Sequence, residues 1–140
     1  MGRKKKIPEP LRRFVRTRAK GRCEYCLIHE DDMLFPHEPD HIDAEKHGGL
    51  TDADNLAWSC YHCNRNKGSD IASLDPQTGK REFLFHPRKQ QWRRHYRLNG
   101  PLIEPLTASA RATVALLQLN HPDRVERRLG LIALGHYPRG

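Results

Sequence analysis

Two Cys-x-x-Cys pairs are the residues most suited to chemistry in this chain: Cys23 with Cys26, and Cys60 with Cys63. Each pair spans one tight turn, so its two sulfurs can reach a shared ion, and four thiolates complete the tetrahedral shell of zinc. The same residues fit two disulfides or an iron centre, although a reducing compartment disfavours disulfides. Because four sulfurs leave no open position for water, we expect this ion to be structural.

A second group of polar residues lies between the pairs and directly after them. Asp40 and Asn64 offer carboxylate and amide oxygens, which Mg²⁺ and Mn²⁺ prefer as ligands. His41 is able to take a proton from water near neutral pH. Adjacent side chains on a strand point to opposite faces. Because Pro39 bends the backbone at the end of this strand, however, we expect Asp40 and His41 to reach one pocket.

Asn55 is a further candidate in this group. Its side-chain oxygen is suited to hold the second ring nitrogen of His41 and so fix the tautomer. The alternative is that it satisfies backbone groups of its own loop. The predicted reaction centre therefore has His41 and Asn55 as catalytic residues and Asp40 and Asn64 as metal ligands, apart from the zinc.

The elements predicted around these residues bring the two groups together. Hydrophobic periodicity and turn residues predict a helix, a strand, a loop, a second strand and a second helix. The first helix leads to the first cysteine pair, and the second strand leads to the other pair. These elements cover residues 9–20, 33–42, 43–54, 56–60 and about 61–74.

The rest of the chain alternates short strands and helices. Asn99-Gly100 is a strong hairpin signal, Thr107 is a suitable N-cap, and Pro122 suits the first turn of a helix. The apolar stripe of that last helix is predicted to contain Val125, Leu129 and Ile132. The predicted elements are a strand at 83–85, a helical segment at 88–94, a hairpin at 96–103, and helices at 108–119 and 122–134.

Charge is distributed in three blocks, with a net charge of +8 over residues 1–20, −8 over 21–75 and +8 over 76–140. An acidic centre suits a divalent cation, and basic flanks attract a polyanion such as nucleic acid. The alternative for any one side chain is a solvated helix face, and Lys67 in particular can offset the negative end of its helix. The candidate nucleic-acid-binding residues are Arg12, Arg13, Arg16, Arg65 and Lys67.

Size and composition bound the organisation of the chain. A length of 140 residues with 36% hydrophobic and 30% charged residues fits one domain with a modest core that a metal would help to stabilise. Since no apolar stretch approaches the ~18 residues that span a bilayer, we expect a cytoplasmic protein without a membrane partner. We expect a disordered basic arm at 1–7, a core at 8–75, and an extension at 76–140 packed on the same domain.

These motifs resemble those of the HNH endonucleases of the ββα-metal superfamily, in particular small bacterial or phage members with four zinc-binding cysteines. Asp40-His41 matches the first His motif, Asn55 the central Asn, and Asn64 the position of the final His. The resemblance covers residues 23–68, and residues 83–129 are similar to the tail of a bacterial subfamily of small HNH proteins.

The resemblance implies an α+β fold: a ββα-metal core held by the zinc site, flanked by an N-terminal helix and a C-terminal hairpin and helices. It also implies a metal-dependent endonuclease that hydrolyses DNA in preference to RNA. Asp40 and Asn64 would hold Mg²⁺ or Mn²⁺, His41 would act on water, and the products would be 5′-phosphate and 3′-hydroxyl ends. The alternative is a non-catalytic zinc-ribbon protein that binds nucleic acid; nicking or double-strand cutting, and monomer or homodimer, stay open.

Overall fold

The computed structural model describes residues 7–139. Of the basic arm predicted at residues 1–7, only Ile7 is therefore described, and it packs against a buried cluster that contains Val15 and Trp58. The rest of the predicted arm lies outside the described residues. No helix in the described part of the chain is long and apolar enough to cross a membrane.

An antiparallel hairpin of β1 (Glu38–His41) and β2 (Leu56–Ser59) lies at the centre of the fold. Its register places Asp40 opposite Ala57 and His41 opposite Leu56. Directly opposed residues of an antiparallel pair point to the same face, and successive residues point to opposite faces. Asp40 and His41 therefore lie on opposite faces of the hairpin.

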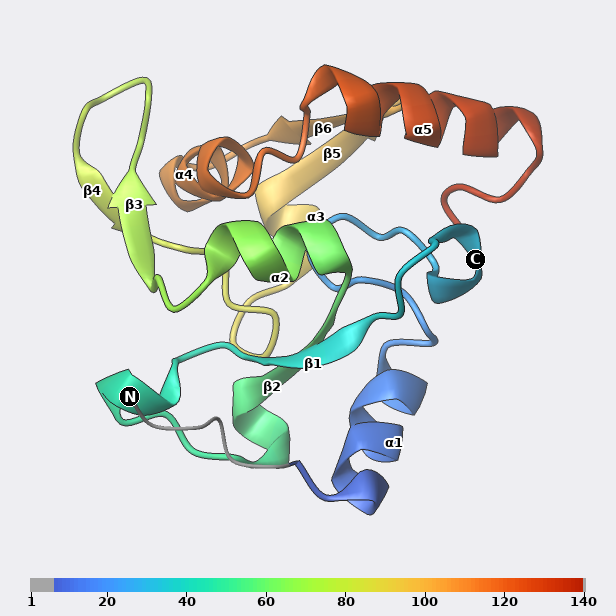
Figure 1. Cartoon of the computed structure of the whole chain (residues 1–140). Helices are drawn as coiled ribbons and strands as arrows, with labels where there is room; N and C mark the ends of the chain where they lie inside the picture. The colour runs from blue at the N-terminus through green and yellow to red at the C-terminus, as the bar shows by residue number, and fades with distance from the viewer. Residues whose placement is uncertain (1–6, 140) are drawn as a thin grey trace.

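Helices cover both faces of this hairpin (Figure 1). The helix α2 (Tyr61–Lys67) begins directly after Cys60 and lies along β1 on the face of Asp40. The helix α1 (Glu9–Arg18) packs on the other face, where its Val15 is buried together with Leu56 of β2. Strand, strand and helix thus form the predicted ββα arrangement.

The helix α2 is shorter than predicted. It ends at Lys67, and Gly68 follows with a φ of 54°, a conformation that favours glycine and turns the chain away from the helix axis. Residues 72–74, predicted as the end of this helix, instead form β3 (Ala72–Leu74), which pairs with β4 (Arg81–Phe83). The strand predicted at 83–85 is shifted by two residues.

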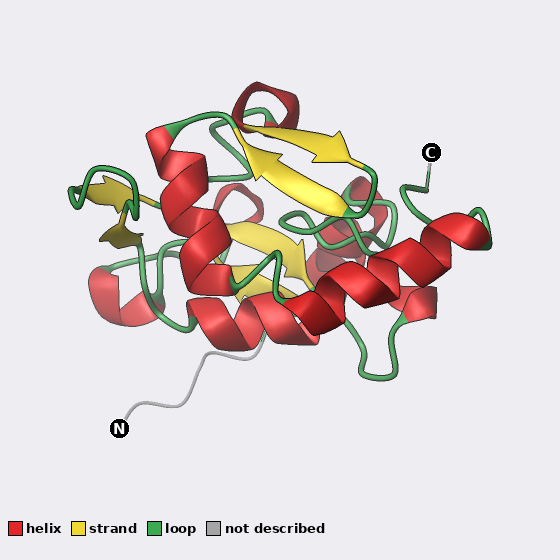
Figure 2. Ribbon diagram, turned by 90° about the horizontal axis from the view of Figure 1, so that it is seen from above, coloured by secondary structure: helices red, strands yellow, loops and turns green. Residues whose placement is uncertain are grey.

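The remaining elements follow the prediction more closely. Thr107 caps α4 by accepting a hydrogen bond from the amide of Ala110, and the hairpin of β5 and β6 turns at Gly100-Pro101, one residue later than predicted. Figure 2 shows the two-stranded sheets as separate pieces among the helices. These elements are α3 (Trp92–His95), β5 (Tyr96–Asn99), β6 (Leu102–Pro105), α4 (Ala108–Leu117) and α5 (Pro122–Ala133), and the 3-10 turns are η1 (Glu30–Asp32), η2 (Glu45–His47) and η3 (Ala53–Asn55).

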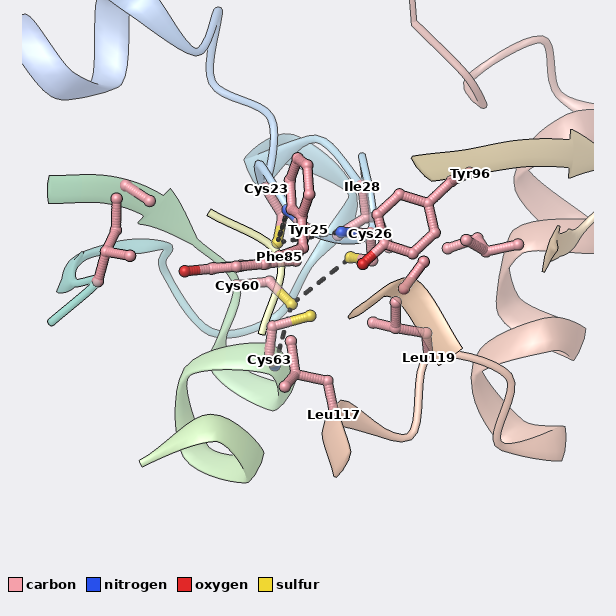
Figure 3. Packing of buried hydrophobic residues seen from close by; sticks show 14 residues of the cluster. Cys23, Tyr25, Cys26, Ile28, Cys60, Cys63, Phe85, Tyr96, Leu117 and Leu119 are labelled. Carbon is pink, nitrogen blue, oxygen red and sulfur yellow. Dashed lines mark hydrogen bonds between the residues drawn. The ribbon is translucent and has the colours of Figure 1, made fainter. Parts of the chain in front are cut away.

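The main buried cluster joins the cysteines to the C-terminal part of the chain. Phe85, Tyr96, Leu117 and Leu119 pack in the same cluster as the cysteines (Figure 3). The fold is therefore α+β with small sheets around a cysteine cluster, as predicted.

The stripe predicted for α5 is wrong at Leu129, whereas Val125 and Ile132 are partly buried. Leu129 is 56% exposed, whereas Arg128, one residue earlier, is buried. The guanidinium of Arg128 donates to the carbonyls of Pro101 and Leu119, so its charge is held by backbone oxygens of the neighbouring loops. Apolar periodicity does not reveal an arginine that is buried in this way.

Candidate functional site

Four buried sulfurs form the most compact group of potential ligands in the described residues. The Sγ atoms of Cys23, Cys26, Cys60 and Cys63 all lie within 4.8 Å of one another. The Sγ atoms of Cys26 and Cys60 are 3.7 Å apart, close to the ~3.8 Å expected for two sulfurs that share a tetrahedral zinc. The cluster is compatible with zinc binding, as the cysteine spacing predicted.

Local backbone geometry directs these sulfurs inward. The amides of Tyr25 and Cys26 point to the sulfur of Cys23 at 3.4 and 3.5 Å, and the amide of Cys63 points to that of Cys60 at 3.4 Å. Cys60 is also the N-cap of α2. Both turns therefore present N–H groups to a sulfur, an arrangement that stabilises thiolates.

The pKa values of two thiols in the cluster are shifted in opposite directions. Burial raises the pKa of the Cys23 thiol, whereas hydrogen bonds from the other three thiols lower the pKa of Cys26. The cluster thus favours the thiolate at Cys26 and the protonated thiol at Cys23. A soft divalent cation is the partner that such a donor set selects.

Asp40 lies on the α2 face of β1 and is 2% exposed. Its Oδ2 accepts a hydrogen bond from the Tyr25 hydroxyl at 3.1 Å and lies 3.3 Å from Nζ of Lys67. Burial and then the charge of Asp40 raise the pKa of Tyr25, so this phenol stays protonated and donates. The carboxylate is thus tied to the first cysteine turn and to α2.

His41 lies on the other face and is 6% exposed. Its Nε2 is 2.9 Å from the hydroxyl of Thr51 and 3.3 Å from a carboxylate oxygen of Glu45. The expectation that Pro39 would bring Asp40 and His41 into one pocket is therefore wrong, because the regular β pairing continues through His41. The two side chains therefore point to opposite faces of the hairpin.

Asn55 does not contact His41, so its predicted role as the tautomer-fixing partner is corrected. Its amide donates to the carbonyls of Asp43 and Leu50, and its oxygen accepts from the amide of Asp43. A Cβ added at Gly49 would lie 1.7 Å from the carbonyl of Asp43. Asn55 and Gly49 therefore fix the loop between β1 and β2, and Thr51 and Glu45 on that loop hold the histidine ring.

The helix α2 carries the remaining candidates of the centre. Asn64 lies one turn before Lys67, on the helix that packs against Asp40. Lys67, predicted to contact nucleic acid, is 1% exposed and binds the carboxylate of Asp40 and the carbonyl of His41. In this conformation it is an internal counter-ion instead. Arg65 is exposed and bonds to the hydroxyl of Tyr61.

The arginines of α1 differ in their freedom to meet a ligand. Arg12 lies over the ring of Trp58, with 5.4 Å between Cζ and the ring centroid. Arg16 forms an ion pair with Glu30 at 2.8 Å and is still 57% exposed. Arg13 is exposed on the same helix. The structure brings these arginines to the surface, on the opposite side of the hairpin from α2.

A cavity of about 520 Å³ lies beside the end of β1. One wall is the loop that follows His41, and the other is the segment Phe83–Gln90 of the C-terminal extension. Asp40 and His41 are not among its lining residues. The polar side chains that line it are Asp43, His47, Lys67, His86, Lys89 and Gln90.

The sequence did not reveal three partners of the site: Tyr25, Glu45 and Thr51. Tyr25 stands inside the first cysteine pair, where its position next to the ligands is a weak signal. Glu45 stands four residues after His41, yet that spacing has meaning only once the 3-10 turn η2 is known. Nothing in the local pattern distinguishes Thr51 from an ordinary loop residue.

A comparison with protein families finds a match at residues 23–70 to a model described as HNH endonuclease. No curated protein and no solved structure matches the chain. The matched segment contains all four cysteines and Asp40, His41, Asn55 and Asn64, so it joins the sulfur cluster to the β1–β2–α2 unit described above. Residues 23–70 accordingly match the HNH endonuclease family, and the match covers about a third of the chain.

Proposed function

We propose that the protein is a metal-dependent endonuclease that hydrolyses phosphodiester bonds of DNA. The observation that carries the proposal is the coincidence of the HNH match with the β1–β2–α2 unit, in which Asp40, His41 and Asn64 occupy adjoining elements. The net charge of +8 and the exposed arginines of α1 support a polyanionic substrate.

His41 is the proposed general base. Glu45 and Thr51 both approach Nε2, and a carboxylate beside this nitrogen favours the tautomer that carries its proton there. Within residues 7–139, Nδ1 makes no hydrogen bond, so its lone pair is the one that would accept a proton from water. The imidazolium so formed would be stabilised by Glu45.

The outer edge of β1 is the proposed position of the scissile phosphate. Side chains on opposite faces of a strand both border its edge, and β1 pairs only with β2 among the described strands. A phosphodiester along that edge would have His41 on one side and Asp40 on the other. The carbonyl of His41, which accepts from Lys67, lies between them.

Asp40 and Asn64 are the proposed ligands of a catalytic Mg²⁺ or Mn²⁺. Their carboxylate and amide oxygens fit these ions in chemical type, and both residues belong to the β1–α2 packing. A bound divalent ion would stabilise negative charge on the leaving 3′ oxygen. Because Lys67 neutralises Asp40 in this structure, the carboxylate must exchange its ammonium partner before it can act as a ligand.

The cavity beside β1 is the proposed seat of the substrate backbone near the cleavage point. Lys89, His86 and His47 bring potential donors to its walls, with Asp43 as the acidic exception. Burial lowers the pKa of His86, so this imidazole is mostly neutral at pH 7 and acts by hydrogen bonding. Contacts of this kind position a nucleic acid without reading its sequence.

Supercoiled plasmid incubated with the protein tests the proposal. We expect nicked or linear product with Mg²⁺ or Mn²⁺ and none with EDTA, and we expect the ends to be religated by a DNA ligase, as 5′-phosphate and 3′-hydroxyl ends are. Binding of DNA without metal-dependent product would overturn the proposal in favour of a non-catalytic binding protein. Cleavage of RNA alone would overturn the choice of DNA.

A further inference from the structure

An arginine from the C-terminal helix contacts the cysteine cluster. Nη2 of Arg124, on α5, donates to Sγ of Cys63 at 3.0 Å and points to Sγ of Cys60 at 3.9 Å. Nη1 of the same side chain donates to the carbonyls of Leu117 and Gln118 at 2.7 and 3.2 Å. The guanidinium is therefore fixed by backbone oxygens on one side while the other side faces sulfur.

Charge balance gives this contact a function. Four thiolates around a divalent ion leave two negative charges in a buried cluster, and buried charge is costly unless it is paired and hydrogen-bonded. Arg124 supplies one positive charge in direct contact with two of the four sulfurs. Groups that hydrogen-bond to metal ligands typically change metal affinity by ~10–100-fold when they are removed.

The chain after α5 contacts the other cysteine turn. The hydroxyl of Tyr137 donates to the carbonyl of Cys26 at 2.8 Å. Arg139 forms an ion pair with Asp32 at 2.9 Å, close after that turn. We call residues 122–139 the C-terminal clasp: it contacts the second cysteine pair through Arg124 and the first through Tyr137. In Figure 1 the chain after α5 turns back toward the blue-green segment of residues near 30–35.

We propose that Arg124 is a built-in part of the metal site, and that metal loading and docking of the C-terminal clasp stabilise each other. The metal holds both cysteine turns in the positions that Arg124 and Tyr137 contact. The clasp in turn offsets thiolate charge and covers the sulfurs. This inference concerns the sulfur cluster alone and is independent of any nuclease activity.

Zinc release to a coloured chelator in excess measures the first half of the proposal. Relative to the parent, Arg124→Gln should release zinc ~10–100-fold faster, and Arg124→Lys, which retains the charge, should recover part of the loss. Arg127→Gln is the matched control, because Arg127 lies on the same helix, is exposed, and donates to the carbonyl of Asp32 at 3.5 Å without a hydrogen bond to a cysteine in the described part of the chain. In cobalt-loaded protein the thiolate charge-transfer bands should shift in Arg124→Gln and not in Arg127→Gln.

Limited proteolysis of the parent measures the second half. As the chelator removes metal, cleavage within residues 122–139 should appear together with zinc release, and Arg124→Gln should be cut there even when loaded. Equal release rates for the parent, Arg124→Gln and Arg127→Gln would overturn the role of Arg124. A clasp that stays resistant in metal-free parent would overturn the coupling. If Arg124→Gln does not fold, the release rate of Arg124→Lys against that of Arg127→Lys decides, with faster release from the former expected.

Discussion

The ammonium of Lys67 lies 3.3 Å from a carboxylate oxygen of Asp40, and both side chains are almost fully buried. The same ammonium donates to the carbonyl of His41 at 3.2 Å. One lysine thus connects α2 to the two adjacent residues that the HNH motif contributes. It also neutralises the carboxylate that a divalent ion would otherwise bind.

Replacement of Lys67 by methionine tests this relationship. Without metal, Lys67→Met leaves Asp40 buried without its cation, and we expect a loss of ~3–5 kcal/mol in the free energy of unfolding. If Asp40 is a metal ligand, Mg²⁺ should raise the melting temperature of this variant more than that of the parent, because the ion replaces the missing charge. Equal shifts in both proteins would argue against Asp40 as a ligand. Lys80→Met, an exposed change, is the control.

Replacement of Asn55 by aspartate tests the loop that holds His41. The carboxylate keeps the oxygen that accepts from the amide of Asp43 but no longer donates to the carbonyls of Asp43 and Leu50. A buried group left without its partner costs ~1–3 kcal/mol, so chemical denaturation should give a loss of about that size. Asp52→Asn, at an exposed position of the same loop, should change stability little. A stable Asn55→Asp protein would contradict the bonding described.

Acid sensitivity should depend on Asp75. Hydrogen bonds from Arg111 hold the pKa of this carboxyl well below its ordinary value. A carboxyl with a depressed pKa in the folded state contributes stability above its unfolded pKa of about 3.9, and that stability is lost as pH falls further toward the folded value. Melting temperatures between pH 7 and pH 2 should therefore fall less steeply for Asp75→Asn than for the parent, from a lower starting value. Parallel curves would exclude this linkage, and Asp70→Asn, an exposed aspartate, is the control.

Salt dependence of DNA binding should depend on Lys89. It is exposed at the cavity beside β1, and a lysine that contacts phosphate releases about one counterion. Lys89→Ala should therefore weaken binding uniformly across sequences and reduce the slope of log affinity against log salt by about 1. Lys80→Ala, on the turn between β3 and β4, should leave the slope unchanged. An unchanged slope in Lys89→Ala would show that Lys89 does not contact the DNA backbone.

Sequence spacing was most informative where covalent geometry dominates. A Cys-x-x-Cys turn can present its sulfurs in few ways, so the spacing of Cys23, Cys26, Cys60 and Cys63 was enough to predict their cluster. The start of helix α4 was likewise predictable from its N-cap residue, Thr107. The helix α2 ends earlier than the sequence predicts, because Gly68 stops it before Ile71.

Polar contacts between distant segments were not predictable in the same way. The residue type of Asn55 predicts a contact with His41, but its partners are backbone groups of the loop. Sequence spacing does not reveal contacts with backbone groups. The sequence predicts that Lys67 contacts nucleic acid or offsets the negative end of its helix, and lysine is rarely buried. Lys67 is buried because it lies in the last turn of α2, where the helix packs beside Asp40 of β1. Arg124 lies 61 residues from Cys63, beyond the reach of any local pattern.

The most direct test of the nuclease assignment is the rate of Mg²⁺-dependent plasmid cleavage by His41→Ala beside His121→Asn. The second variant changes an exposed histidine and retains an acceptor at the N-cap of α5. We predict that His41→Ala loses cleavage while it still binds DNA and retains zinc, and that His121→Asn cleaves at the parent's rate. Cleavage by His41→Ala at the parent's rate would contradict the role of His41 as the base.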